Sequence, residues 1–199
     1  MSTSVADLVR QLSSPDFNER ALALARLIMK GNAATPALTE LLKSPDEDLR
    51  TKAAQGLAEI ADPASADTLA GLLDDENGLI RARAAQGLAL MNDPRALDAL
   101  VRTIDDAEDI LHVDHTLSTY GLIRMGPPAL PAVAPLLKSD DPLTREHAFL
   151  VVTSIVSKLP EGKDLDGLSR SLGSYDPHGA APERERAADQ WLDWISRRG

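Results

Sequence analysis

The chain contains no cysteine and very few aromatic residues: two Trp, two Tyr and two Phe among 199 residues. The absence of cysteine excludes disulfides, thiolate zinc sites and cysteine nucleophiles. The scarcity of aromatic and β-branched residues argues against a β-sandwich or a β-barrel, whose strands need those side chains. Helix-forming residues are abundant instead, with 29 alanines and 31 leucines. The composition therefore predicts an all-α protein.

Long apolar runs are also missing. No stretch approaches 18 consecutive apolar residues, so the sequence predicts no membrane-spanning helix. Residues 1–12 lack the basic segment followed by an apolar run that marks a secretory signal. We therefore expect a cytoplasmic protein with no membrane partner.

Positive charge is in the minority: 21 Lys and Arg face 31 Asp and Glu, which gives a net charge of −10. A general nucleic-acid binder needs a basic face that displaces counterions from phosphates. The acidic balance argues against nucleic acid as a partner, although it leaves room for a local basic stripe. A chain of this length is expected to form one domain, residues 1–199.

An internal repeat organises the sequence. Residues 53–58 recur as residues 84–89, and residues 14–16 recur as residues 44–46. Extending these matches gives columns of equivalent residues, the first of which is basic. This Arg column is Arg20, Arg50, Arg81, His115, Arg145 and Arg184. A small column follows three residues later, and a large apolar column follows seven residues later: Leu27, Leu57, Leu88, Leu122, Val152 and Trp191.

Each repeat is predicted to be a short helix followed by a longer one, because its apolar residues recur at helical spacing. One such pair has no partner for its apolar face, and stacked pairs bury a continuous core. The sequence therefore predicts a right-handed α-solenoid of about six helix pairs. The predicted repeats are roughly residues 4–31, 35–61, 63–91, 94–125, 128–159 and 163–198.

Helix starts are predicted where Ser or Asp precedes Pro, as at Ser14, Ser44 and Asp141, because the side chain can cap free amides while Pro occupies the first turn. Ser44 with Glu47 fits a capping box. Pro135 falls inside a predicted helix and should bend it, because proline lacks a backbone donor. Gly, Ser, Pro and Asp between residues 173 and 181 predict a mobile surface loop.

The spacing Asp-x-x-x-Arg-x-x-Ala-x-x-x-Leu, seen from Asp16 to Leu27 and from Asp46 to Leu57, resembles HEAT repeats. The period of about 30 residues is similar to that of the short HEAT-like repeats of the phycobilisome-lyase class. The resemblance covers almost the whole chain. It implies a solenoid and a function as scaffold, adaptor or inhibitor, with only a few enzymes. His115 in the Arg column, an expanded fourth repeat around residues 105–109 and the loop 173–181 depart from the pattern.

The Arg column has two interpretations. In the first, each Arg bonds the acidic residues or the carbonyls of a turn between repeats. In the second, the column forms a basic ridge that binds phosphates, as in HEAT-like DNA glycosylases. Those enzymes also need a carboxylate beside aromatic residues, and the only aromatic pair here is Trp191 with Trp194. We expect this pair to seal the last open face, and a ligand-gripping role is the alternative.

Three histidines could contribute to a metal site: His112, His115 and, one repeat later, His147. His112, Asp114 and His115 are close in sequence, and residues three apart share a helix face. HEAT-like di-iron hydroxylases use paired His-Glu steps, whereas Glu146 and His147 occur once and in reverse order. The chain also lacks GxGxxG, Walker, HExxH and nucleophile-elbow motifs. The sequence therefore predicts no catalytic residue, no cofactor and no metal, and it leaves enzymatic activity an open question.

The outward positions of the second helices suggest a binding surface. Second helices line the concave side of HEAT-like solenoids, and apolar residues with Tyr and Arg nearby are typical of binding hot spots. The predicted partner-binding residues are Arg83, Leu90, Leu117, Tyr120, Arg124, His147 and Leu150. Alternatively, a bent solenoid buries some of these against neighbouring helices. The same positions of the first repeat, Leu22, Ala25 and Met29, are either capped or a docking site for a partner or second copy.

We therefore expect a non-catalytic scaffold or adaptor that binds an unidentified protein on its concave face, as a monomer or within a hetero-complex. Two alternatives come from other classes. One is a bilin lyase-like or chromophore-handling factor, which the repeat length suggests. The other is a HEAT-like DNA-binding protein.

Overall fold

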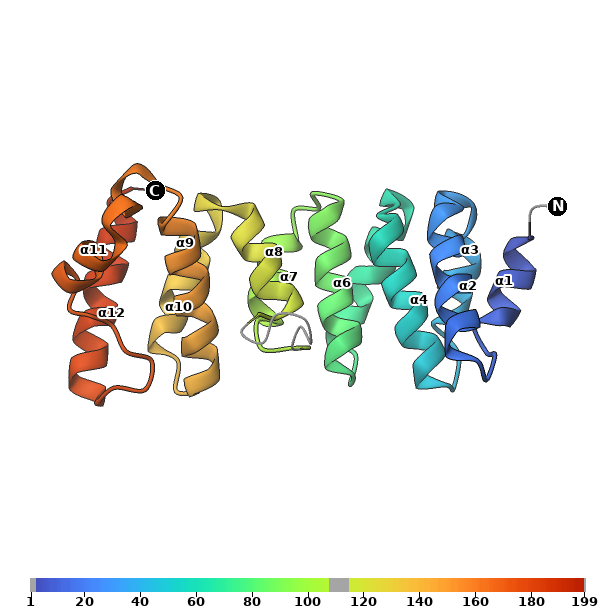
Figure 1. Cartoon of the computed structure of the whole chain (residues 1–199), viewed down its shortest axis with the longest axis horizontal. Helices are drawn as coiled ribbons and strands as arrows, with labels where there is room; N and C mark the ends of the chain where they lie inside the picture. The colour runs from blue at the N-terminus through green and yellow to red at the C-terminus, as the bar shows by residue number, and fades with distance from the viewer. Residues whose placement is uncertain (1–2, 108–114, 199) are drawn as a thin grey trace. The chain divides into compact units, whose positions relative to one another are not determined.

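The computed structural model describes residues 3–107 and 115–198. Every regular element of these residues is an α-helix or a 3₁₀ helix, in agreement with the predicted all-α class. The chain divides into an N-terminal unit, residues 1–99, and a C-terminal unit, residues 100–199 (Figure 1). The prediction of a single right-handed solenoid with about six helix pairs stays a prediction.

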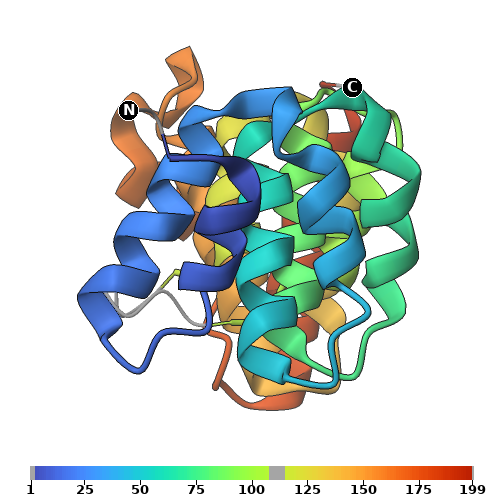
Figure 2. The ribbon, with the colours of Figure 1, turned by 90° about the vertical axis from the view of Figure 1, so that its right-hand side faces the viewer.

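The N-terminal unit alternates short and long helices, as the repeat predicts. Its α-helices are α1 (Val5–Gln11), α2 (Phe17–Met29), α3 (Thr35–Leu41), α4 (Glu47–Ile60), α5 (Ala66–Gly71) and α6 (Gly78–Leu90). Three 3₁₀ turns complete it: η1 (Gly31–Ala33), η2 (Pro63–Ser65) and η3 (Leu72–Asp74). Each short helix packs on the long helix that follows it, and Figure 2 shows α1 beside α2 at the near end.

The long helices of the N-terminal unit stack in order, α2 on α4 and α4 on α6. Leu27, Leu57 and Leu88, the large apolar column, are fully buried between them. Glycine makes the close approach possible, because a Cβ on Gly87 would lie 2.9 Å from the Cα of Ala58 on the neighbouring helix. The buried columns therefore set both the register and the spacing of this stack.

The long helices begin two residues later than the Ser-Pro pattern predicts. Asp16 and Asp46 are the N-caps of α2 and α4, and their carboxylates accept backbone N–H groups of the first turn. Ser44 lies in the preceding turn, where its hydroxyl accepts the N–H of Asp46 at 3.1 Å. The predicted capping box of Ser44 with Glu47 is therefore wrong, because an aspartate closer to the helix takes the N-cap position.

The C-terminal unit is less regular. Helix α7 (Ala96–Arg102) runs across the boundary at residue 99. The elements that follow are α8 (Leu117–Met125), η4 (Pro127–Ala129), α9 (Leu130–Val133), η5 (Ala134–Lys138), α10 (Pro142–Val156), η6 (Pro160–Asp164), α11 (Leu165–Ser171) and α12 (Ala181–Ser196). Pro135 falls where α9 gives way to the 3₁₀ helix η5, which agrees with the predicted disruption.

The loop 173–181 is anchored to the C-terminal unit. Tyr175 is buried, and its hydroxyl donates a hydrogen bond of 2.6 Å to the carbonyl of Leu137. Arg145 donates from Nε to the carbonyl of Pro177 at 2.8 Å. Most other residues of the loop are exposed, as expected of a surface segment, while the buried ring of Tyr175 and the bond from Arg145 tie the loop to the C-terminal unit.

Four of the six aromatic residues form one cluster in the C-terminal unit. The ring of Phe149 lies 4.9 Å from that of Tyr175 and 5.9 Å from that of Trp191, measured between centroids. Trp194 packs edge-on against Trp191 at 6.1 Å. Trp191 is fully buried, so it fills the core as predicted for a residue of the large apolar column.

In the part of the chain that the structure describes, none of the helices is both long enough and apolar enough to cross a membrane.

Candidate partner-binding faces

The predicted partner-binding residues divide between the two units. Arg83 and Leu90 lie on α6 of the N-terminal unit. The other five lie in the C-terminal unit, on α8 and α10: Leu117, Tyr120, Arg124, His147 and Leu150. There are therefore two faces to describe, one on each unit.

The N-terminal face is most apolar on α2. Met29 is 86% exposed and Leu22 is 50% exposed, and their separation of seven residues places them on one side of the helix. Ala25 is exposed between them. These are the residues for which the sequence left capping or docking open, and within the N-terminal unit they face solvent.

The N-terminal face becomes polar on α4 and α6. Gln55 donates a hydrogen bond of 2.8 Å to Glu59, and Arg83 donates one of 3.0 Å to Gln86. Leu90 is exposed at the end of α6. Arg83 is half-buried and held by Gln86, and the exposed large apolar side chains of α6 are those of Leu79 and Leu90.

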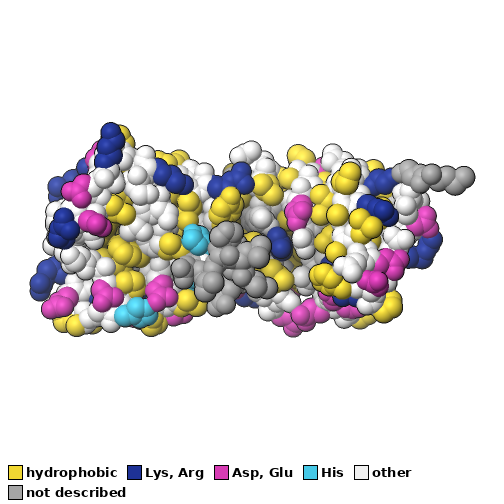
Figure 3. Space-filling model, viewed as in Figure 1, with side chains coloured by type: hydrophobic (Ala, Val, Ile, Leu, Met, Phe, Trp, Pro, Cys, Tyr) yellow, Lys and Arg dark blue, Asp and Glu magenta, His cyan; other side chains and the backbone are white. Residues whose placement is uncertain are grey.

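Acidic side chains gather along the edge of the N-terminal unit where the long helices begin, and Figure 3 shows magenta groups along that lower edge. Exposed members include Asp16, Asp46, Glu47, Asp48 and Glu76. Carboxylates are favoured there, because free N–H groups and the helix dipole make a helix N-terminus positive. The helix N-termini therefore explain why acidic residues gather at this edge, without any ligand.

The C-terminal face is built around Tyr120 on α8. Tyr120 is 56% exposed, and Arg124, one turn later on the same side of the helix, is also exposed. Leu117 lies one turn earlier and is half-buried, as is Leu150 on α10, which packs against α8. Tyr120 and Arg124 are therefore the most accessible of the predicted residues in this unit.

His147 is a correction to the predicted rim. It is only 7% exposed, because its Nδ1 lies 2.7 Å from a carboxylate oxygen of Asp105 in the turn after α7. Thr144 donates a second hydrogen bond to Asp105 at 2.5 Å. Burial raises the pKa of Asp105, but the bonds from His147 and Thr144 outweigh it and hold the pKa below its ordinary value. His147 therefore ties α10 to the turn after α7 and offers nothing to a partner.

The Arg column bonds the carbonyls of turns, as its first interpretation predicts. Arg20, Arg50, Arg81 and Arg145 each donate from Nη1 to two successive carbonyls in the turn before their helix, at 2.7 to 3.2 Å. Arg184 donates in the same way to the carbonyl of Gly179 at 3.0 Å. These guanidinium groups are committed to the fold, which removes the support for a phosphate-binding ridge.

Acidic neighbours of the Arg column belong to the next repeat. Oδ2 of Asp48 lies 3.9 Å from Nε of Arg20, and Oε1 of Glu76 lies 3.9 Å from Nη2 of Arg50. The residue four positions before Arg81 is Asn77, which caps α6 and also donates to Glu47 at 2.7 Å. The column therefore links neighbouring repeats as well as closing its own turns.

Residues 3–107 and 115–198 contain no group of three or more His, Asp or Glu side chains that could hold a metal ion. His112, one of the histidines considered as metal ligands, and the neighbouring Asp114 lie outside the described residues.

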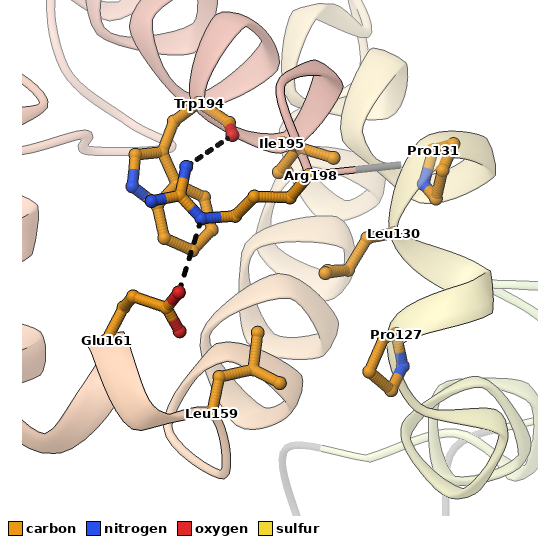
Figure 4. A pocket seen from close by; sticks show the side chains of 8 residues that line it. All are labelled: Pro127, Leu130, Pro131, Leu159, Glu161, Trp194, Ile195 and Arg198. Carbon is orange, nitrogen blue, oxygen red and sulfur yellow. Dashed lines mark hydrogen bonds and ion pairs between the residues drawn. The ribbon is translucent and has the colours of Figure 1, made fainter.

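A pocket of about 280 Å³ lies in the C-terminal unit, where α12 ends (Figure 4). Its lining residues are Pro127, Leu130, Pro131, Leu159, Glu161, Trp194, Ile195 and Arg198. Sequence reasoning missed this pocket, because its walls come from separate segments with no common spacing. The one signal was the alternative ligand-gripping role of the tryptophan pair, and only Trp194 of that pair lines the pocket.

The comparison with protein families identifies the chain. The model of HEAT repeats matches residues 5–89, 35–116 and 71–151, which together span most of the sequence. The chain belongs to the HEAT repeat family. This match is to HEAT repeats in general, so the likeness of this HEAT repeat protein to the phycobilisome-lyase class stays an expectation.

Solved structures similar to this HEAT repeat protein include engineered and designed proteins. One is an engineered protein with 21% identity and a TM-score of 0.47, with coverage of 98% of this chain and 99% of that chain. Another is a designed armadillo repeat protein in complex with the peptide (KR)4, with 20% identity, a TM-score of 0.45, and coverage of 97% and 100%. No curated protein matches the chain.

Proposed function

We propose that this HEAT repeat protein is a non-catalytic scaffold or adaptor that binds a protein partner through the outward faces of its long helices. The residues proposed to contact the partner are Arg83, Leu90, Leu117, Tyr120, Arg124 and Leu150. A cytoplasmic location, a concave binding side and a monomer or hetero-complex belong to the same proposal.

The exposed pair of Tyr120 and Arg124 is the observation that carries the proposal. Tyr and Arg are the residues most enriched in binding hot spots, since each combines a large contact surface with hydrogen-bonding groups. Tyr120 on α8 is 56% exposed. Burial of an aromatic ring is favourable, so a partner that covers this ring would gain binding free energy. Leu117 on α8 and Leu150 on α10, which packs against α8, are half-buried and add apolar surface for an apolar partner segment.

The N-terminal face adds a second contact area. Leu22 and Met29 expose large apolar side chains on one side of α2. Acidic residues line the edge of that unit where the long helices begin. A partner that combines apolar side chains with flanking basic residues would complement this face.

The test is affinity capture from a lysate of the source organism, with mass spectrometry of the retained proteins. The test variant carries Tyr120→Asp and Arg124→Glu. The matched control makes the same change of charge at two exposed sites on α11 of the same unit, Ser171→Asp and Arg170→Glu. All three proteins must give the same helical circular dichroism before they are compared.

A protein that is retained by the wild type and the control but lost from the test variant supports the C-terminal face. A protein retained equally by all three overturns that face. The variant Leu22→Asp, Met29→Asp then tests whether the partner uses the N-terminal face instead.

The two alternatives from the sequence make separate predictions. A chromophore-handling factor must change the visible absorption of an added open-chain tetrapyrrole. A DNA-binding protein must retard duplex DNA with a steep dependence on salt, because phosphate contacts release counterions.

A further inference from the structure

The pocket at the end of α12, hereafter the α12 pocket, shares no residue with the faces proposed above. Leu130, Leu159 and Ile195 point toward its interior in Figure 4, and the ring of Trp194 closes one side. Pockets that enclose a drug-sized ligand run from about 300 to 1,000 Å³. A volume of about 280 Å³ therefore suits one bulky apolar side chain and the backbone next to it.

Two charged side chains lie at the edge of this apolar space. The guanidinium of Arg198 lies 3.8 Å from the centroid of the Trp194 ring, and Nη1 of Arg198 donates a hydrogen bond of 2.9 Å to the carbonyl of Trp194. Stacking on the ring and this bond fix the guanidinium in place. Arg198 is therefore held ready to donate to a ligand.

Glu161 supplies the opposite charge. One of its carboxylate oxygens lies 3.8 Å from Nε of Arg198, which is farther than a hydrogen bond of about 2.7–3.2 Å. Each group therefore neutralises the charge of the other, while hydrogen-bonding capacity remains on both. A donor beside an acceptor, with no net charge, complements a neutral dipolar group better than it complements an ion.

We propose that the α12 pocket binds a partner peptide segment through one leucine or phenylalanine side chain. The side chain enters the space between Leu130, Leu159 and Ile195. The adjoining peptide bond lies at the edge of the pocket, where Arg198 donates to its carbonyl and Glu161 accepts its N–H. The peptide bond is the common neutral group in proteins that offers a donor and an acceptor side by side.

Nuclear magnetic resonance with small probes tests this site in the full-length chain. The probes are N-acetyl-leucinamide, N-acetyl-glycinamide, which lacks the apolar side chain, and the anion N-acetyl-leucine. The chain has two tryptophans, so two indole N–H signals are expected, and Trp194→Phe assigns them. We expect N-acetyl-leucinamide to shift the Trp194 signal saturably, with a dissociation constant on the order of millimolar for so small a ligand.

The expected order of response is N-acetyl-leucinamide first, with N-acetyl-glycinamide far weaker. Leu159→Asp should weaken binding by about tenfold or more, because it places a charge in the apolar space. Leu143→Asp, at an exposed site of the same unit, should leave binding unchanged. The signal of the fully buried Trp191 reports whether each variant keeps its fold.

The proposal is overturned by the absence of a saturable shift, by equal shifts with the leucine and glycine amides, or by loss of binding in Leu143→Asp as well. A stronger response to the anion than to the neutral amide also overturns it, because Arg198 would then recognise a carboxylate. The test is separate from that of the helix faces, since the variant Tyr120→Asp, Arg124→Glu should bind the probes normally. Failure of either proposal therefore leaves the other standing.

Discussion

The N-terminal unit repeats one packing solution, whereas the C-terminal unit adapts it. Arg20, Arg50 and Arg81 each bond two successive carbonyls of the turn before their helix. Arg145 does the same in the C-terminal unit, but it also bonds the carbonyl of Pro177 in the loop 173–181. An arginine of the Arg column therefore closes only its own turn where the repeat is regular. Where the repeat is interrupted, Arg145 closes its turn and also holds a distant loop.

The cores of the two units differ in the same way. The stack of α2, α4 and α6 is filled by Leu and Ala, and Gly87 allows α6 to approach α4 closely. The C-terminal unit gathers Phe149, Tyr175, Trp191 and Trp194 instead. Aliphatic and small side chains suffice where similar helices stack directly on one another. Large rings fill the space where a loop and a last helix interrupt that stacking.

The largest expected effect compares two residues of the large apolar column, both fully buried. Trp191→Ala should lower the free energy of unfolding by about 3–5 kcal/mol, because it removes a large ring and leaves a cavity. Leu88→Ala in the N-terminal unit should cost about 2–4 kcal/mol. Amide hydrogen exchange, read separately for each unit, measures both. A larger loss for Leu88→Ala would contradict the view that the aromatic cluster carries the C-terminal core.

The Arg column provides the next comparison. Arg145→Ala should cost about 2–3 kcal/mol and Arg50→Ala about 1–2 kcal/mol, because Arg145 is buried and donates one more hydrogen bond. Denaturant unfolding gives both values. Arg145→Ala should also raise proteolytic cleavage within residues 173–181, and unchanged cleavage would show that Arg145 does not anchor the loop.

Glycine substitutions test the close packing of the N-terminal unit. Gly87→Ala should cost about 1–2 kcal/mol, because its Cβ would collide with the backbone of Ala58. Gly71→Ala is the matched control, since no atom lies within 4 Å of its added Cβ, and it should be neutral or stabilising by up to about 1 kcal/mol. Thermal unfolding distinguishes them, and equal effects would mean that α4 and α6 can separate at no cost.

Alkaline pH should act on the C-terminal unit through Tyr175. Burial raises the pKa of Tyr175 to about 12, above its ordinary value of about 10. The folded state therefore keeps a proton that the unfolded chain loses, so stability is complete below pH 10 and falls as the pH rises through about 12. At pH 11, one unit above the ordinary pKa, the expected loss is about 1.4 kcal/mol.

Tyr175→Phe should remove this pH dependence, and Tyr120→Phe, at an exposed tyrosine, should keep it. Unfolding midpoints measured from pH 9 to pH 12 show which tyrosine is responsible. An unchanged profile in Tyr175→Phe would contradict the assignment.

The sequence predicted which positions of a repeat are buried. It did not predict the contacts that an insertion makes with a repeat. The large apolar column predicted Leu27, Leu57, Leu88 and Trp191 as buried residues, and all four are. His147 was placed on an outward face by the same spacing, but Asp105 from the expanded fourth repeat covers it. A helical wheel describes one helix, so it contains no information about a side chain that arrives from an insertion.

The sequence by itself determined the all-α class and the HEAT repeat, because each follows from spacing along one chain segment. It left two interpretations of the Arg column, and the hydrogen bonds to turn carbonyls decided between them. Tertiary structure alone decided three features: the burial of His147, the anchoring of the loop 173–181 by Tyr175 and the α12 pocket. Each of these brings together residues from separate segments, such as Glu161 and Arg198, that share no period. Local helix geometry fixes the first kind of feature, whereas packing between segments fixes the second.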